Sequence, residues 1–270
     1  GGAARERTFP DGVTTKHLDG FVSWMDADGL STATQRRRVS AVRRFYDWLC
    51  ENGDRSTNPV RGPLSIPREP ESSSSEDGFL TAGQIESLLG GLDRSSNEGR
   101  RTFALILVIL YGSLRRAEVA SLNIDDVRPL GRRWVIDLPQ TSSGTGGYVP
   151  IPDPVVDAVQ SLTEVYGEDS GPLWRSFSNR NRGERLSPDA LYKSLRRAGE
   201  SGGLEGVTIE RLRQSGLRLA SAGGASIQAV QEHARLRSAR STARYAEMDP
   251  NRDRLGKTLD ERIPIDLSAY

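Results

Sequence analysis

The sequence is poor in cysteine, in lysine and in long apolar segments. A single cysteine, Cys50, excludes a disulfide within the chain and a cysteine-based zinc site, and it is typical of a protein of the reducing cytoplasm. The longest apolar run, residues 103–110, is far shorter than the roughly 20 residues that a membrane-spanning helix requires. It therefore predicts a buried helix and no membrane partner. Lysine occurs only at three positions, Lys16, Lys193 and Lys257.

The net charge is close to zero, although charged residues are abundant. The 37 Lys and Arg residues are set against 36 Asp and Glu residues, so the class of partner has to be inferred from local clusters of charge. A length of 270 residues favours two domains over one compact unit.

A linker divides the chain near residue 70. Residues 65–78, "SIPREPESSSSEDG", combine proline, four serines and acidic residues with almost no apolar side chain, which predicts an exposed connection. We therefore expect a helical domain over residues 1–66, a linker over residues 67–78 and a larger domain over residues 79–270.

The first domain is predicted to contain two helices. One begins near Val13 and buries Leu18, Phe21, Val22 and Met25; the second follows Ser31, a plausible N-cap, and buries Val42, Phe45, Tyr46 and Leu49. The opposite face of the second helix carries five arginines: Arg36, Arg37, Arg38, Arg43 and Arg44. Such a cluster indicates either a surface that follows a nucleic-acid backbone or a solvated basic face, and this helix alone does not decide between them.

The second domain is predicted to be mainly helical with one small antiparallel sheet. A helix is expected after Thr81, a buried one over residues 103–110 and another in "LRRAEVASL". "RRWVIDLP" and "GYVPIP", separated by a stretch of Ser, Gly and Thr, predict two paired strands. Further helices are expected at about residues 153–165, 188–199, 208–222, 226–235 and 239–248.

Three stretches in a fixed order resemble the tyrosine recombinase (phage integrase) family: "YGSLRRAEVASL", then "ERLRQSG", then "STARY". The resemblance runs from about residue 12 to residue 250. It implies that Arg115 and Arg213 hold the attacked phosphate and that Tyr245 is the nucleophile. Glu118 lies three residues after Arg115 on the same predicted helix, so we expect it to orient a guanidinium. An ordinary exposed helix acid is the alternative interpretation of Glu118.

The implied chemistry explains these residue types. A covalent phosphotyrosine conserves the energy of the broken phosphodiester, and two permanently charged guanidiniums suit the negative charge of the transition state. This chemistry needs no cofactor and no metal. The implied partners are double-stranded DNA, three further copies of the chain in a tetramer on two duplexes, and an accessory or partner recombinase. The implied location is the cytoplasm, in association with the nucleoid.

The sequence departs from the family pattern at several positions. The hairpin lacks the family's lysine, and the nearest cations are Arg132 and Arg133, which are poor proton donors. Glu210 takes the place of the first box histidine, and Leu236 takes the place of the second His or Trp. His233 lies one helical turn earlier, and we expect it on the surface.

Three functions remain open at this stage. They are an active or slow site-specific recombinase, a recombinase-derived DNA-binding protein with a degenerate site, and a helical protein unrelated to DNA. DNA contacts are expected from the five arginines of the second helix and from a second group around the tyrosine: Arg235, Arg237, Arg240 and Arg244.

Both ends of the chain carry an expectation. The first domain is expected to lack the family's first helix, because residues 1–11 are short and polar. After the tyrosine, Leu255, Leu259 and Ile263 recur at helical spacing, so we expect an amphipathic tail. The resemblance implies that this tail packs into a neighbouring subunit.

Overall fold

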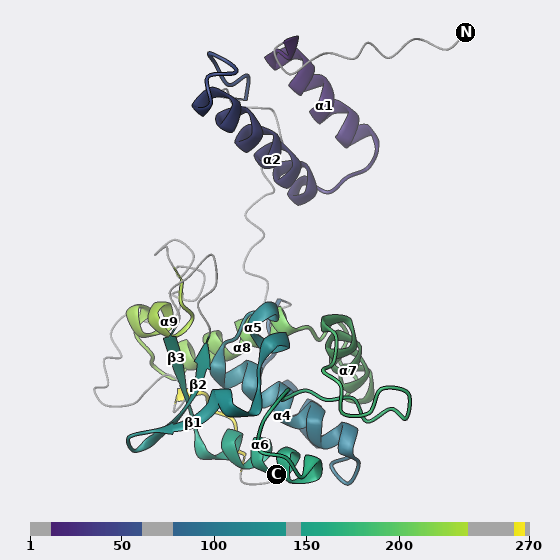
Figure 1. Ribbon diagram of the computed structural model, residues 1–270, viewed down its shortest axis with the longest axis vertical. Helices are drawn as coiled ribbons and strands as arrows, with labels where there is room; N and C mark the ends of the chain where they lie inside the picture. Colours follow the sequence, from purple (N-terminus) through teal and green to yellow (C-terminus); the bar gives the residue numbers. More distant parts are fainter. Residues whose placement is uncertain (1–11, 61–77, 139–146, 237–261, 268–270) are drawn as a thin grey trace. The chain divides into compact units, whose positions relative to one another are not determined.

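The chain forms two compact units. The computed structural model describes residues 12–60, 78–138, 147–236 and 262–267. The units are Gly1–Ser74 and Ser75–Tyr270, so the division falls inside the serine-rich segment (Figure 1). None of the helices in the described ranges is long and apolar enough to cross a membrane.

The N-terminal unit is a pair of helices, α1 (Thr15–Ala27) and α2 (Thr32–Glu51). The hydroxyl of Ser31 accepts a hydrogen bond from the backbone N–H of Thr34 at 3.3 Å, which is the predicted N-cap. Leu18, Val22 and Met25 of α1 share a core with Val39, Tyr46 and Leu49 of α2. The expected burial of Phe45 is wrong: its side chain is 46% exposed, because the buried stripe of α2 follows positions 39, 46 and 49.

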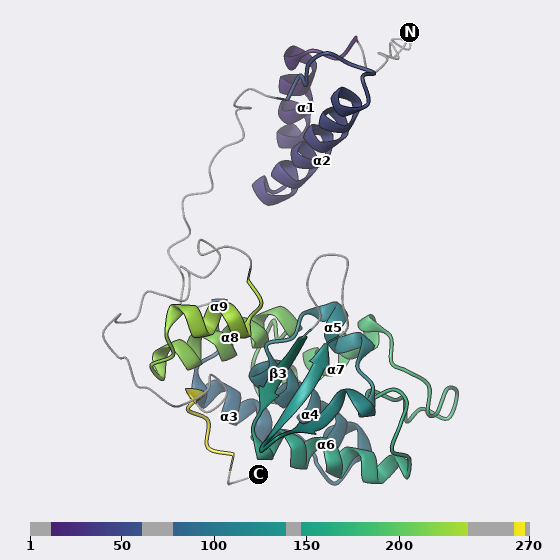
Figure 2. The same cartoon turned by 60° about the vertical axis from the view of Figure 1, so that its left-hand side comes forward.

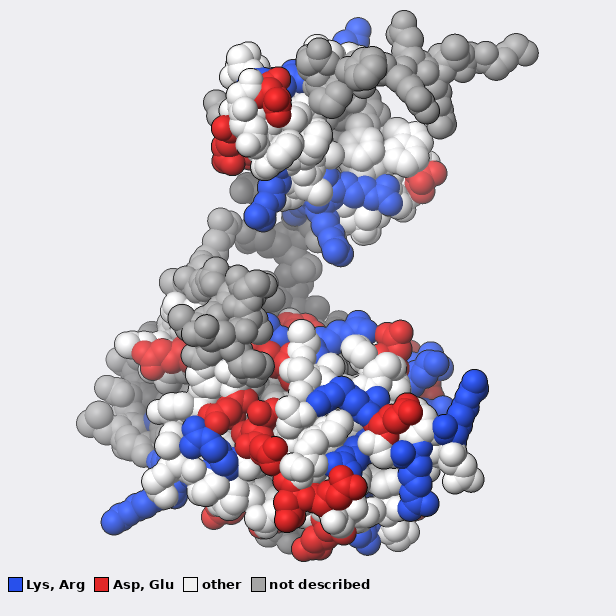
Figure 3. Space-filling view, viewed as in Figure 1, with Lys and Arg blue, Asp and Glu red and all other residues white. Residues whose placement is uncertain are grey.

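All five predicted arginines of α2 are exposed. Basic side chains gather at the end of this unit where α2 begins (Figures 1 and 3). Arg43 also bonds its own unit, because its Nε donates to the carbonyl of Val60 at 3.2 Å. Arg43 therefore fastens the segment after α2, whose Asn58 donates to the carbonyl of Arg43 at 3.0 Å.

The C-terminal unit is built around α4 (Asn97–Gly112). Every residue of α4 from position 101 to position 112 is buried, as the apolar run predicts. The helix packs against α6 (Asp153–Tyr166), α7 (Pro188–Ser201), α8 (Ile209–Ala222) and one strand, and it runs through the middle of the unit (Figures 1 and 2). The described part of the unit also contains the shorter helices α3 (Ala82–Gly90), α5 (Arg116–Ser121) and α9 (Ile227–His233).

A three-stranded antiparallel sheet covers one side of the unit, in the order β1 (Val127–Leu130), β2 (Arg133–Leu138), β3 (Gly147–Ile151). It follows the 3₁₀ turn η3 (Ile124–Asp126). The two predicted strands are β2 and β3. Strand β1 was not predicted, because its sequence "VRPL" contains a proline, which strands accept only at a sheet edge.

A close approach of α8 to α4 positions the side chain of Arg213. A Cβ atom added at Gly216 would lie 2.2 Å from the backbone oxygen of Leu110. Only a residue without a side chain permits this contact. Arg213, about one helical turn before Gly216, is consequently held against the C-terminal end of α4.

The described part of the C-terminal tail packs on its own unit. Ile263 and Ile265 are both buried in the main core cluster, and Arg262 donates to the carbonyl of Gly224. Ile263 lies in irregular structure, so its expected place in a helix is wrong. Leu255, Leu259 and the helix expected at about residues 239–248 lie outside the described residues.

Replacing Gly216 by alanine tests the helix contact. We expect Gly216→Ala to lower the free energy of unfolding by about 1–3 kcal/mol, the usual cost of overpacking a core. The matched control is Gly83→Ala in α3, where an added Cβ meets nothing within 4 Å. The control should be neutral or gain up to about 1 kcal/mol, as alanine is the better helix former. Thermal and urea unfolding measure both, and equal stabilities would contradict the tight α4–α8 contact.

Candidate active site

The candidate site lies where α4 ends and α5 begins, beside α8 and α9. Figures 1 and 2 both place α5, α8 and α9 along the same side of the C-terminal unit. The backbone of Ser113, the C-cap of α4, is in the left-handed region with φ 49°. Leu114 is buried, and Arg115 follows as the N-cap of α5. The turn thus anchors Arg115 between two helices.

Glu118 is a buried carboxylate at the centre of this turn. Its Oε2 accepts from the backbone N–H of Arg115 at 2.6 Å, and its Oε1 accepts from Nη1 of Arg115 at 3.2 Å. A glutamate at the third helical position often closes a helix start in this way. The side chain is only 7% exposed, so the interpretation of Glu118 as an exposed helix acid is wrong, while its contact with the Arg115 guanidinium is present.

Arg213 is buried in spite of its charge. Its Nε donates to the carbonyl of Ser113 at 2.9 Å, and its Nη2 donates to the carbonyl of Ala234 at 3.2 Å. Only 5% of the residue is exposed. Arg213 can therefore be buried on the inner face of α8, because backbone carbonyls at the ends of α4 and α9 accept its hydrogen bonds.

Arg115 reaches the same chain segment as Arg213. Its Nη2 donates to the carbonyl of Arg235 at 2.8 Å, next in sequence to the carbonyl that Arg213 uses. The structure thus brings together Arg115 and Arg213, which we call the arginine pair. Their neighbouring acceptors lie directly after α9.

A third guanidinium, that of Arg235, lies in the same place. Its Nη2 donates to Oε2 of Glu118 at 2.8 Å and to the carbonyl of Ser113 at 3.2 Å. Burial lowers the pKa of the Arg235 guanidinium, and the neighbouring Glu118 opposes part of that effect. The sequence placed Arg235 among arginines expected to contact DNA, and nothing in the pattern separated it from them.

Glu210 lies at the edge of the arginine pair. Its Oε1 accepts from Nη1 of Arg213 at 3.3 Å and from the amide of Gln214 at 2.7 Å. Its side chain is 58% exposed. One N–H donor of Arg213 is therefore bonded to a carboxylate that is itself exposed to solvent.

The expected surface position of His233 is wrong. The residue is buried, and its Nε2 lies 2.8 Å from the backbone oxygen of Tyr111 in α4. The imidazole ring therefore connects α9 to α4 and is buried. Leu236 is partly buried against the main core.

Several predicted site residues lie outside the described residues. They are Tyr245, Arg237, Arg240 and Arg244, together with the hairpin tip at residues 139–146. Arg132 and Arg133, at the entrance of β2, are both exposed. Among the described residues, no group of His, Cys, Asp and Glu could hold a metal ion.

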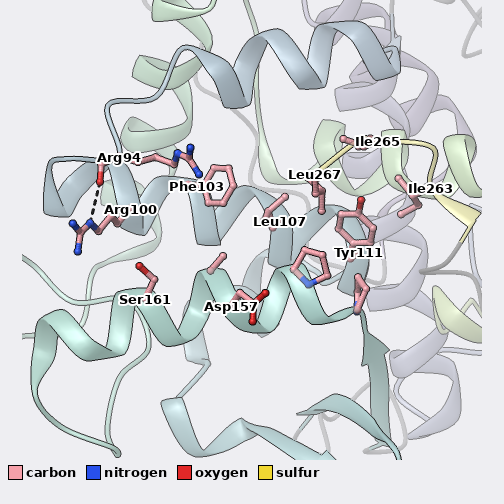
Figure 4. A pocket seen from close by; sticks show the side chains of 13 residues that line it. Arg94, Arg100, Phe103, Leu107, Tyr111, Asp157, Ser161, Ile263, Ile265 and Leu267 are labelled. Carbon is pink, nitrogen blue, oxygen red and sulfur yellow. Dashed lines mark hydrogen bonds between the residues drawn. The ribbon is translucent and has the colours of Figure 1, made fainter. Parts of the chain in front are cut away.

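A pocket of about 900 Å³ lies between α4, α6 and the tail, and none of Arg115, Arg213 and Arg235 lines it (Figure 4). Phe103, Leu107 and Tyr111 of α4 line it, and Ile263 and Ile265 lie on the side of the tail. The pocket therefore belongs to the surface on which the C-terminal tail packs and not to the candidate site.

The charges of the site favour an anion. The guanidiniums of Arg115 and Arg235 bond the buried carboxylate of Glu118, and the buried guanidinium of Arg213 bonds the carbonyl of Ser113 beside them. With the exposed Glu210 counted as well, three positive charges stand against two negative ones. Guanidiniums bond the oxygens of a phosphate in pairs, and an environment of low dielectric constant strengthens that attraction. The site is thus suited to a phosphate group.

Comparison with known proteins gives the same family over both units. The phage integrase family matches residues 78–252, and the N-terminal SAM-like domain of phage integrases matches residues 9–53. The tyrosine recombinase XerD of Listeria innocua serovar 6a is 26% identical over 237 residues, covering 85% of this chain and 76% of the relative. The tyrosine recombinase XerA of Pyrococcus furiosus is 25% identical, covering 78% and 68%.

Solved structures show the same fold. A lambda integrase dimer (residues 75–356) bound to a COC' core site gives a TM-score of 0.65 at 17% identity, covering 93% of this chain and 86% of that one. The XerH recombinase in a post-cleavage complex with a palindromic difH substrate gives 0.64 at 20% identity, covering 87% and 69%. The mainly helical fold with its small antiparallel sheet is therefore confirmed. Because the matched family covers more than half of the sequence, the chain belongs to the phage integrase family, the tyrosine site-specific recombinases.

Proposed function

We propose that this chain cleaves and rejoins DNA at specific sites through a 3'-phosphotyrosine on Tyr245. The observation that carries the proposal is the convergence of Arg115 and Arg213 on one turn and on two successive carbonyls. These carbonyls lie shortly before the segment that contains Tyr245 in the sequence. One phosphate could then meet both guanidiniums and the phenol.

In the proposed step, the phenol oxygen of Tyr245 attacks the phosphorus and the bond to the 5' oxygen breaks. The phenol loses its proton and the departing 5' oxygen gains one. A 5' hydroxyl that attacks the phosphotyrosine reverses the step and rejoins a strand. Arg115 and Arg213 neutralise the charge that develops on the phosphate oxygens. Glu118 is a positioning residue, since it holds the backbone and the guanidinium of Arg115.

Double-stranded DNA is the proposed partner. The exposed arginines of α2 and the positive site in the C-terminal unit support a backbone-binding surface on each unit. The lambda integrase and XerH structures that share the fold are, by their titles, complexes with DNA sites. A nucleoid-associated location in the cytoplasm goes with this proposal, as does action beside a partner recombinase.

A second function, that of a DNA-binding or accessory protein with a degenerate site, is favoured by two observations. No lysine occurs between residues 17 and 192, so the hairpin lacks one. In addition, Glu210 places a carboxylate on Arg213. Each general acid or base contributes roughly 10² to 10⁴ in rate, so their absence leaves slow cleavage or none.

A test of the first function begins with a duplex selected by binding from a randomised library and nicked near the cleaved bond. Loss of the short 5' hydroxyl fragment prevents religation, so a covalent adduct should accumulate slowly. Tyr245→Phe should form none, because it lacks the nucleophile. Arg115→Ala and Arg213→Ala should each slow the adduct by roughly 10² to 10³, the usual effect of removing one group that stabilises the transition state. Denaturing gels of the trapped complex measure the rate.

The control for this test is Arg196→Ala, which removes an exposed arginine paired with Glu200 on α7. It should form the adduct at the unaltered rate. A tightly bound duplex that yields no adduct with the unmodified protein would decide for the accessory function.

DNA binding by α2 is tested through its dependence on salt. The plot of log affinity against log salt concentration should become shallower by about 1 for each phosphate that the protein no longer neutralises. We therefore expect the slope of this plot to become shallower by up to about 2 in the double variant Arg37→Ala/Arg38→Ala. Lys16→Ala, an exposed cation on α1, is the control and should leave the slope unaltered. Fluorescence anisotropy gives both slopes, and identical slopes would remove α2 from the binding surface.

Assembly on DNA is tested by shortening the tail. We propose that residues 250–270 link subunits in a tetramer on two duplexes. Deleting residues 250–270 should abolish the slowest-migrating complexes on native gels while single-subunit binding persists. Deleting residues 268–270 alone is the matched control, since Ile263 and Ile265 remain. Higher-order complexes of undiminished yield after the longer deletion would give the tail another role.

A further inference from the structure

The site contains more positive charge than the arginine pair accounts for. Arg115 and Arg235 bond Glu118, and Arg213 and Arg235 bond the carbonyl of Ser113. We call these three arginines the arginine cluster. Glu118 is the buried carboxylate among them, whereas Glu210 is largely in solvent. Buried charges are costly unless they are paired, so a cluster with this excess is expected to be completed by an anion.

Arg235 holds the cluster together through four contacts. Its Nη2 bonds Glu118 and the carbonyl of Ser113, its Nη1 donates to the carbonyl of His233 at 3.0 Å, and its own carbonyl accepts from Arg115. The side chain is 18% exposed. Both its side chain and its backbone therefore connect α9 to the turn that carries Arg115.

Two features of Arg235 cost free energy in the folded chain when no ligand is bound. Its backbone is in the left-handed region with φ 53°, which residues with a Cβ atom avoid. Its Nε is buried, and no acceptor within the described part of the chain bonds it. Such features persist where the surroundings or a function require them.

The contacts of Arg235 explain how it could act on the arginine pair. Glu118 has two oxygens, and Arg235 and the Arg115 backbone share Oε2, which leaves Oε1 to the Arg115 guanidinium. Ser113 likewise offers one carbonyl to both Arg235 and Arg213. Without Arg235, Glu118 and Ser113 would each have one guanidinium partner fewer, and the orientation of both members of the pair would loosen.

We propose that Arg235 is a positioning residue of the phosphate site, which orients Arg115 through Glu118 and Arg213 through the Ser113 carbonyl and adds a third positive charge. This inference rests on the proposed recombinase function. It identifies a function for a largely buried side chain that the sequence grouped with the arginines expected to contact DNA.

Arg235→Gly tests the inference, because glycine accepts the left-handed backbone and removes the guanidinium. With saturating DNA, we expect the rate of adduct formation to fall about 10- to 100-fold, which is the effect of removing a residue that orients a metal ligand and which we expect to hold for residues that orient a phosphate-binding guanidinium. The dissociation constant for DNA should rise much less than the rate falls, because the exposed arginines of α2 bind DNA independently of this site. The melting temperature of the variant reports any loss of folding. Arg235→Lys keeps the charge but not the planar fork, so its rate should lie between the two.

Inorganic phosphate provides a readout that does not depend on cleavage. Phosphate should raise the melting temperature of the unaltered protein more than that of Arg235→Gly, at equal ionic strength. General exclusion of phosphate from protein surfaces affects all variants alike, so the difference between variants reports the site. Arg196→Ala controls for the loss of one positive charge and should respond as the unaltered protein does.

The outcomes separate this inference from the proposed function. If the unaltered protein forms no adduct, the recombinase proposal fails, and the phosphate response of Arg235→Gly still decides the inference. An Arg235→Gly protein with undiminished adduct rate and phosphate response would overturn it. If Arg235→Gly melts much earlier, Arg235→Lys decides, and a full rate in that variant would show that charge alone, without positioning, is needed.

Discussion

The site depends on one buried carboxylate. Glu118 bonds the backbone N–H and the guanidinium of Arg115 and also the guanidinium of Arg235. Removing one partner of a buried ion pair destabilises the folded protein, because the remaining charge is left buried and uncompensated. The start of α5, the direction of Arg115 and the end of α9 are thus joined by a single side chain, and none of the three can move independently.

Backbone carbonyls provide most of the remaining contacts. Arg213 bonds the carbonyls of Ser113 and Ala234, and Arg115 bonds that of Arg235. The last carbonyls of a helix lack partners within it, so charged donors are natural partners for them. The geometry of the arginines therefore follows from where α4 and α9 end, and the close approach of α8 at Gly216 fixes the third side of the site.

The sequence predicted the parts of the fold that local physics determines. Helical spacing and the caps at Ser31 and Thr81 indicated helices close to their observed bounds, and the ordered motifs indicated the arginine pair. The inward turn of Arg235 could not be predicted, because it requires a left-handed residue and acceptors from distant segments. The burial of His233 was missed for the same reason, since its partner is a carbonyl of α4.

The packing of the C-terminal tail on its own unit has a consequence for how copies of the chain could associate. Ile263 and Ile265 already bury their side chains on their own unit. If a tail is exchanged between subunits, the same apolar area is buried before and after, so the exchange itself changes the free energy little. The balance then depends on effective concentration, which rises when two subunits are held on neighbouring DNA sites. Under these conditions, DNA would select the exchanged form without any new contact surface on the protein.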